Sequence, residues 1–163
     1  MSDLQRLAAH HAAALLRFER ENREWFARSV PDRGDAYFAD FAARHAGLLA
    51  EQETGRCHFH VLVEPDGTVL GRFNLVDVAD GEAELGYRVA ERAAGRGVAT
   101  DGVRRVVALA RQAYGLRRLT AQTTMDNAGS RAVLGRTGFT PVGEVSLDGR
   151  PGLRFARELT ADD

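Results

Sequence analysis

The sequence predicts an α+β fold, with helices packed on a mixed and mostly antiparallel sheet. Three runs rich in β-forming residues, at 57–64, 68–76 and 82–90, follow one another with only short turns between them. Strands joined in this way pair antiparallel. A helix, a further strand at 118–124, a short helix and a closing hairpin then follow. This order lacks the regular alternation of strand and helix that a doubly wound parallel sheet requires.

The N-terminal third has helical patterns. Apolar spacing from Leu7 through Phe18 predicts an amphipathic helix. Residues 2–7 fit either its first turn or a short strand. Asp35 is expected to cap a second helix. The apolar face of that helix would hold Phe38, Phe41, Ala42 and Leu49.

The remaining elements are bounded by turn residues. The turns Pro65-Asp66-Gly67 and Ala79-Asp80-Gly81 separate the three strands. A helix is predicted over 98–114 and ends at Gly115. A short helix is predicted over 127–136, and a hairpin over 139–147 and 153–159 turns at Asp148-Gly149.

Length and composition predict one domain, over residues 1–163. The chain has 163 residues, of which 44% are hydrophobic and 28% charged, and a formal net charge of −1. This near-neutral charge argues against a dedicated nucleic-acid or polybasic membrane binder. No apolar run approaches the ~20 residues of a membrane helix, and no secretory signal is visible. We therefore expect a cytoplasmic protein.

Cysteine and histidine usage argues against disulfide or metal chemistry. Cys57 is the single cysteine, and we expect it to be a buried thiol rather than a nucleophile. His58 and His60 share a strand face without a carboxylate cluster, which favours a solvated face over a metal site. No metal is expected. All 22 basic residues are arginine, so any cationic contact to a phosphate must come from a guanidinium.

The strongest local feature spans residues 82–105, where a strand, a glycine-bearing loop and a helix follow one another. Gly95 and Gly97 allow the backbone to approach a ligand, and the first helical turn presents free N–H groups. The arrangement suits a phosphate or pyrophosphate, although an ordinary tight turn explains the glycines equally well. A P-loop is excluded because the chain has no lysine. The dinucleotide fingerprint lacks its third glycine, since Thr100 stands there.

Three motifs in a fixed order carry a resemblance to a known family. R-A-A-G-R-G at 92–97 fits the signature [RQ]-x-x-G-x-[GA], and D-N-A-G-S-R-A-V-L-G-R-T-G-F at 126–139 looks like an N-x-x-[SA] segment ending in G-F. With E-L-G-Y-R-V at 84–89, the chain resembles the GCN5-related N-acetyltransferases (GNAT), and within them the RimJ/RimL branch, which acetylates protein N-terminal amines. The resemblance covers about residues 2–160 and is strong over 82–140.

The resemblance implies a sheet of about six or seven strands with helices on both faces, in which residues 2–7 form the first strand. Two central strands would splay apart, around 87–89 and 121–124, and acetyl-CoA would lie between them as cosubstrate. The residues that the resemblance assigns to acetyl-CoA fall into three groups. Backbone groups of Tyr87 and Val89 would pair with the pantetheine arm. Amides from Gly95 to Thr100 would hold the pyrophosphate, namely Gly95, Arg96, Gly97, Val98, Ala99 and Thr100. Arg92 and Arg96 would pair with phosphate oxygens, Asn127 would contact the arm near the thioester, and Arg136 would reach the nucleotide end.

The implied reaction is direct attack of a neutral amine on the thioester, without a covalent acyl-enzyme. Many family members use a tyrosine of the short helix to protonate the departing thiolate, but Leu134 stands at that position. Ser130, one helical turn earlier, is the expected substitute. Glu84 is the candidate base, acting directly or through water, and Glu82 on the same strand face is the alternative. Asn127 is also expected to cap the short helix.

The sequence specifies the site of the amine acceptor less closely than the site of acetyl-CoA. A protein N-terminal amine, as on ribosomal proteins, is the expected acceptor; a small amine such as an amino acid or an antibiotic is the alternative. The expected wall of this site includes Trp25, Phe26, Tyr37 and Phe38. A non-catalytic acyl-CoA-binding module would keep the glycine loop without depending on Ser130 or Glu84, and a plain interaction domain would bind no CoA. A monomer or a homodimer is expected.

Overall fold

The computed structural model describes all 163 residues and contains one sheet of seven strands in the order β1-β2-β3-β4-β5-β7-β6. Every neighbouring pair is antiparallel except β4 and β5. The predicted α+β fold with a mixed, mostly antiparallel sheet is confirmed. In chain order, the elements are β1 (Asp3–Arg6), η1 (Ala9–His11), α1 (Ala12–Glu21), α2 (Arg23–Ala27), α3 (Asp35–Ala39), α4 (Phe41–Glu53), β2 (His58–Val63), β3 (Val69–Ala79), β4 (Glu82–Val89), η2 (Glu91–Ala93), α5 (Val98–Gln112), β5 (Arg118–Thr124), α6 (Ala128–Arg136), β6 (Thr140–Leu147) and β7 (Arg150–Glu158).

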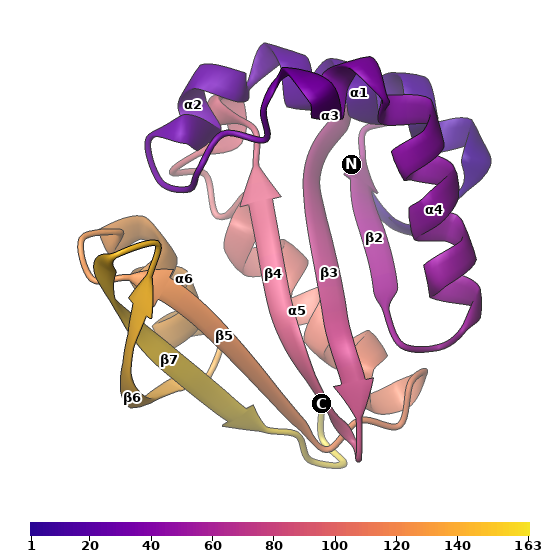
Figure 1. Cartoon of the computed structure of the whole chain (residues 1–163). Coiled ribbons are helices and arrows are strands. Elements are labelled where there is room, and N and C mark those ends of the chain that lie inside the picture. The colour runs from indigo at the N-terminus through magenta and orange to yellow at the C-terminus, as the bar shows by residue number, and fades with distance from the viewer.

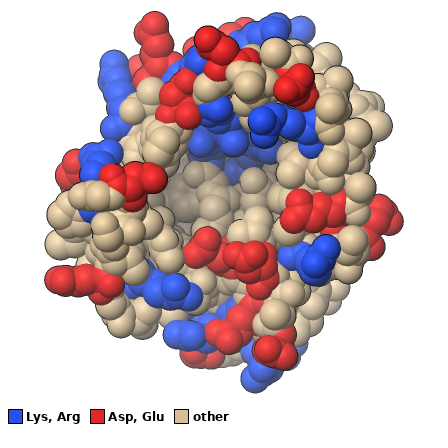
Figure 2. All heavy atoms as spheres, viewed as in Figure 1, with Lys and Arg blue, Asp and Glu red and all other residues tan.

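Helices cover both faces of the sheet (Figure 1). α5 packs behind β3 and β4, where Val103 and Val106 join a core with Phe73 and Leu85. α1 to α4 lie on the other face and toward one end of it, over a second core. Figure 2 shows a hollow in the middle of this second face, beside the N-terminal helices.

A glycine sets how closely α5 approaches the sheet. A Cβ at Gly102 would come within 2.2 Å of the ring of Phe73, a fully buried side chain of β3. Any larger residue would therefore push the helix outward. α5 begins after Gly97 and is followed by Gly115, both at positive φ (76° and 64°). Gly115 lies past the helix end as predicted, although the helix stops two residues before the predicted end at 114.

The two central strands diverge, as the resemblance implies. β4 and β5 pair in parallel only from Glu82↔Arg118 to Leu85↔Ala121. β4 then continues to Val89 and β5 to Thr124 without further pairing between them. A parallel pair needs a long crossover connection, which α5 supplies. The divergence leaves the last backbone groups of β4 without a partner strand on this side.

The N-terminal segment differs from the pattern-based prediction. Residues 3–6 form the strand β1, so the helix predicted from Leu7 starts only at Ala12, after the short turn η1. Leu7 is buried, and its N–H donates to Phe59 O beside β2. Pairing with β2 thus overrides the helical periodicity of these residues.

The second predicted helix is in fact two helices, α3 and α4. Gly34 occupies the N-cap position at φ 87°, and Asp35 is the first helical residue, so the predicted Asp35 cap is wrong. Asp35 instead accepts a hydrogen bond from Arg23 at 2.9 Å. Phe41 is buried, but Ala42 is exposed and does not belong to the apolar face. At the C-terminal hairpin, β7 begins at Arg150 rather than at residue 153.

Cys57 and the two strand histidines are structural. Cys57 is buried as predicted, and burial raises the pKa of its thiol to about 11. The prediction of a solvated histidine face is wrong. His60 is 1% exposed, and His58 stacks on Tyr114 with ring centroids 3.6 Å apart. No group of three or more potential ligand side chains gathers for a metal ion. None of the helices is long and apolar enough to cross a bilayer.

His60 gives the fold a pH-dependent stability. Its Nδ1 lies 3.1 Å from Phe73 O and its Nε2 lies 2.6 Å from the Tyr114 hydroxyl, and burial lowers its pKa from 6.5 to about 4. Between pH 4 and 6.5, His60 therefore binds a proton in the unfolded chain but not in the folded chain. We expect the contribution of His60 to the free energy of unfolding to be constant above pH 6.5 and to fall by about 3 kcal/mol between pH 6.5 and 4.

Urea unfolding between pH 7.5 and 4 measures this loss. In His60→Gln, which removes the titrating group, the fall over that range should shrink. An unchanged pH slope in that variant would show that another group causes it.

Candidate active site

A cavity of about 480 Å³ runs between the end of β4, the start of α5 and one face of α6. Its apolar lining includes Val89, Val98 and Val133, while the polar lining includes the backbone of the glycine loop and two arginines, Arg88 and Arg136. An elongated molecule with an apolar middle and an anionic end fits this chemistry. The cavity is called the donor cavity below.

The start of α5 forms an anion-binding end of the donor cavity. Gly97 occupies the N-cap position in the left-handed region, with φ 76° and ψ 6°. The first intrahelical bond runs from Asp101 N–H to Gly97 O, so the N–H groups of residues 98–100 precede the helical ladder. These donors and the positive end of the helix dipole suit a phosphate group. Gly95, Gly97, Val98, Ala99 and Thr100 all line the donor cavity.

The three arginines predicted to contact acetyl-CoA do not all lie at the donor cavity. Arg136 lines the donor cavity. Arg92 is exposed and forms an ion pair with Glu64, which turns it toward the β2–β3 connection. Arg96 is exposed and does not line the donor cavity. The structure therefore brings Arg136 to the cavity and leaves Arg92 and Arg96 outside it.

The end of β4 offers backbone groups to the gap between β4 and β5. The N–H and C=O of one strand residue point to the same side, and those of the next residue to the opposite side. Ala90 N–H donates to Leu70 O on β3, so Tyr87 and Val89 face away from β3 into the gap. The C=O of Val89 accepts a hydrogen bond from the Trp25 indole at 3.3 Å. The N–H groups of Tyr87 and Val89 have no β5 residue opposite them.

A second cavity of about 460 Å³ adjoins the donor cavity on the hollowed face of the sheet. It lies between the diverging strands, the segment 27–31 and the β6–β7 turn, and Gly86 on β4 forms part of its lining. An added Cβ at Gly86 would meet no atom within 4 Å, so the strand surface there is open. This second cavity is called the acceptor cavity below.

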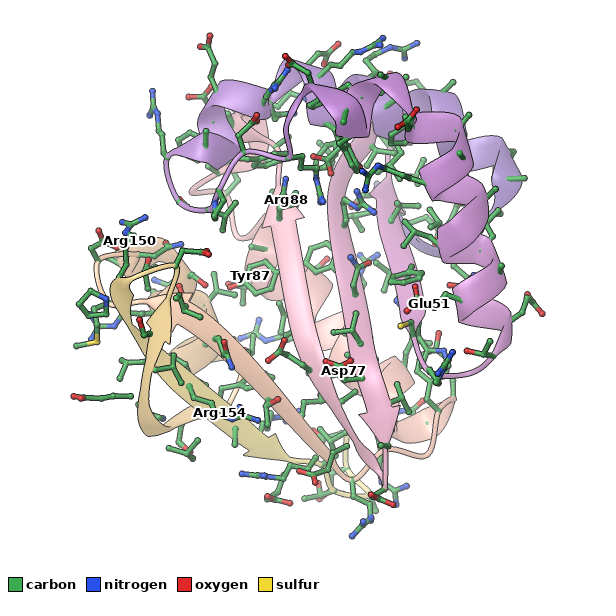
Figure 3. The ribbon with its side chains drawn as sticks, in the orientation of Figure 1. Glu51, Asp77, Tyr87, Arg88, Arg150 and Arg154 are labelled. Carbon is green, nitrogen blue, oxygen red and sulfur yellow. The ribbon has the colours of Figure 1, made fainter.

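Two side chains join the cavities. The Tyr87 hydroxyl lies 3.0 Å from Ser130 Oγ, and both residues line the donor and the acceptor cavity. Figure 3 shows Tyr87 projecting from β4 toward β5 and β7. Burial raises the pKa of the Tyr87 phenol, so the hydroxyl keeps its proton at neutral pH. The pair is thus a neutral proton donor placed where the two cavities meet.

Asn127 holds this part of α6 in place. Its side-chain oxygen accepts the Ser130 N–H at 3.1 Å, so the predicted N-cap is confirmed. Asn127 also lines both cavities, so capping and ligand contact are compatible roles. Leu134 is buried and lines the acceptor cavity, which leaves no tyrosine in this helix.

The two candidate bases lie on the same face of β4 as Gly86. Glu82 is bound by Arg118 at 3.0 Å, whereas Glu84 makes no side-chain hydrogen bond or ion pair. Neither carboxylate lines the two cavities. Glu84 is the nearer of the two along the strand, two residues from Gly86, so a bridging water is the route by which it would reach an amine there.

Sequence reasoning missed two side chains at this site, the phenol of Tyr87 and the guanidinium of Arg88. The sequence motifs assign Tyr87 only backbone contacts and give Arg88 no role. The alternation of Leu85, Tyr87 and Val89 on one strand face places the phenol toward α5 and α6, but no sequence signal gives its distance to Ser130. The predicted acceptor wall is wrong, because none of its four residues lines the acceptor cavity and the neighbouring segment 27–31 does so instead. Trp25 and Phe26 line the donor cavity, whereas Tyr37 is buried and Phe38 lies against Arg23.

Comparisons with known proteins agree with this geometry. The model of one protein family, described as "Acetyltransferase (GNAT) domain", matches residues 3–140. The probable N-acetyltransferase YjcK of Bacillus subtilis is 27% identical over 130 residues, which are 76% of this chain and 72% of YjcK.

Two solved structures show a similar fold. RimJ of Mycobacterium smegmatis, in complex with CoA-disulfide, has a TM-score of 0.86 and 27% identity, covering 96% of this chain and 81% of RimJ. The ribosomal-protein-S5-alanine acetyltransferase of Vibrio fischeri has a TM-score of 0.90 and 18% identity, covering 98% of this chain and 94% of its own.

Proposed function

Because the chain belongs to the GNAT acetyltransferase family, we propose that it transfers the acetyl group of acetyl-CoA to a primary amine, with protein N-terminal amines as the first acceptor class. The observation that carries this proposal is the Tyr87–Ser130 pair at the junction of two cavities. A donor on one side, an acceptor on the other and a proton donor between them are what direct transfer needs. We also propose that the protein is located in the cytoplasm and is a monomer or a homodimer.

Acetyl-CoA fits the donor cavity by its chemistry. Its pyrophosphate would meet the N–H groups of residues 98–100, with Arg136 nearby as a cation. The pantetheine arm would run along the apolar lining, beside the backbone of Val89. Because Val89 C=O already accepts the Trp25 indole, we expect the N–H of this residue to be its free contact.

Residues of this chain then accept and donate the protons of the reaction and stabilise the negative charge that develops. A neutral amine over Gly86 attacks the thioester carbon, and its proton passes to Glu84 through water. The N–H of Tyr87, which also faces the gap, is the available donor to the developing oxyanion. When the C–S bond breaks, Ser130 donates a proton to the thiolate, and Tyr87 replaces that proton on Ser130. Tyr87 then takes a proton from water and Glu84 releases the amine proton to water, which returns both residues to their starting states.

Thermal unfolding with and without acetyl-CoA tests the donor site. A ligand at 100 times its Kd stabilises the folded state by about 2.7 kcal/mol, which corresponds to a rise of about 5–10 °C in Tm for a domain of this size. NADH and ATP serve as controls. A rise with acetyl-CoA alone, followed by thiol release in the presence of N-terminal peptides, is the expected result. No rise would refute the proposal.

A further inference from the structure

A buried cluster beside the acceptor cavity carries more positive than negative charge. Glu19 of α1 is 1% exposed and is its single carboxylate. Three guanidinium groups contact Glu19: Arg33 at 3.1 Å, Arg72 at 2.7 Å and Arg88 at 3.0 Å. An ion pair that only ties α1 to the sheet would need one of them. The cluster therefore holds two positive charges beyond those that Glu19 neutralises.

Neighbouring acids supply only part of the balance. Asp32 and Asp35 both pair with Arg23, at 2.7 Å and 2.9 Å, so this triad has one excess negative charge and the combined group keeps one excess positive charge. Arg44, which is exposed, adds a further positive charge at the edge of the group, 5.6 Å from the ring of Tyr37, which contacts the cluster. Arg72 and Arg88 are held largely away from water, where an unbalanced charge is costly, so a bound anion would stabilise this arrangement.

Two properties of Arg72 and Arg88 indicate that an additional anion would stabilise the cluster. The Nε of Arg72 is buried and has no hydrogen-bond partner, although buried donors are normally paired. Burial lowers the pKa of Arg88, and the charges of Arg33 and Arg72 lower it further, against the opposing effect of Glu19. Both observations concern the side of the cluster that faces the sheet, because Arg72 and Arg88 lie opposite each other on β3 and β4.

The position of Arg88 connects the cluster to the substrate. Gly86 lines the acceptor cavity, with Glu84 two residues before it and Arg88 two residues after it on the same strand face. Two strand residues span roughly 7 Å. Arg88 lines the donor cavity and not the acceptor cavity, but its neighbours in that lining, Ser29 and Val30, belong to both cavities. Figure 3 places Arg88 at the end of β4 near the N-terminal helices. In Figure 2 basic side chains gather on that side of the hollow and acidic ones on the opposite rim.

We propose that the acceptor of this enzyme carries a carboxylate within roughly 7 Å of its amine, and that Arg88 binds this carboxylate. The inference rests on the proposed transfer to an amine and narrows its substrate class. A free amino acid and a peptide N-terminus followed by an acidic residue share this chemistry. A polyamine does not, because its second cation would meet the positively charged cluster.

Matched pairs of acceptors, which differ only in a carboxylate, distinguish a free amino acid from a peptide N-terminus followed by an acidic residue. The first pair is phenylalanine and phenylalaninamide; the second is Ser-Asp-Ala-Ala-amide and Ser-Asn-Ala-Ala-amide, and spermidine is the cationic reference. Thiol release gives kcat/KM at equal concentrations of unprotonated amine. We expect the carboxylate-bearing member of one pair to be favoured at least about tenfold, as for a charge-assisted hydrogen bond. The pair that shows the preference identifies the source.

Variants assign the preference to Arg88. In Arg88→Gln the ratio should fall to about one, whereas Arg88→Lys, which keeps the charge, should retain part of it. Arg44→Gln is the matched control, because it removes a positive charge near the cluster but outside both cavities. It should keep the ratio. A Tm rise with acetyl-CoA shows that each variant is folded and binds the donor.

Each outcome bears on a different claim. Equal rates within both pairs, or a preference for spermidine, would overturn the inference while leaving the proposed function intact. Loss of acetyl-CoA binding in folded Arg88→Gln would assign this arginine to the donor instead and would also overturn it. Acetyl-CoA binding without transfer to any acceptor would refute the proposed function, and the inference with it.

Discussion

Gly97→Glu should abolish measurable binding of acetyl-CoA, with Kd raised at least about 100-fold. Gly97 has φ 76°, a conformation that side chains other than glycine adopt at a cost of about 1–3 kcal/mol. A Cβ there meets no protein atom within 4 Å, so the new side chain would enter the space proposed for the pyrophosphate. Its carboxylate would occupy the N–H donors at the start of α5 and repel phosphate oxygens.

Gly67→Glu is the matched control for this experiment. Gly67 has φ 90° in the β2–β3 turn, also with no atom within 4 Å of an added Cβ, and it lies outside both cavities. The control thus carries the same strain and the same charge. Isothermal titration with acetyl-CoA should give an unchanged Kd for Gly67→Glu. Normal binding by folded Gly97→Glu would show that the pyrophosphate lies elsewhere.

Tyr87→Phe should lower kcat by about 10²–10⁴-fold, the range typical of a lost general acid, and leave the Kd of acetyl-CoA within a few-fold. The variant keeps the ring and removes only the hydroxyl, which lies 3.0 Å from Ser130 Oγ. Because burial raises the pKa of this phenol, its neutral form persists at neutral pH. Tyr87 should therefore cause no loss of activity below its ordinary pKa of about 10.

Steady-state kinetics with Tyr114→Phe as control checks this assignment. The Tyr114 hydroxyl bonds to His60 outside the two cavities, so its loss should leave kcat unchanged. Ser130→Ala should resemble Tyr87→Phe, and the double variant should be little worse than either, because the two hydroxyls act as one unit. Additive losses, or full activity in Tyr87→Phe, would contradict the proton relay.

The bounds of elements that depend on neighbouring residues in the chain could be predicted from the sequence. β5 has the predicted bounds of 118–124, because its β-forming residues stand between clear turn and loop signals. α5 starts at Val98 as predicted, because Gly97 supplies the positive φ before it. The failures lie where long-range pairing overrides local periodicity. Residues 3–6 join β2 as a strand, and His60 is buried by contact with Tyr114, which lies 54 positions further along the chain.

The sequence by itself determined the family, the glycine loop before α5 and the Asn127 cap, since each depends on residues close together in the chain. Only the tertiary structure decided which distant side chains meet. Tyr87 and Ser130 are 43 positions apart, and Glu19 and Arg88 are 69 apart. Their contacts follow from the divergence of β4 from β5 and the packing of α1 over the sheet, and no local pattern encodes those distances. The acceptor chemistry proposed above depends on these long-range contacts.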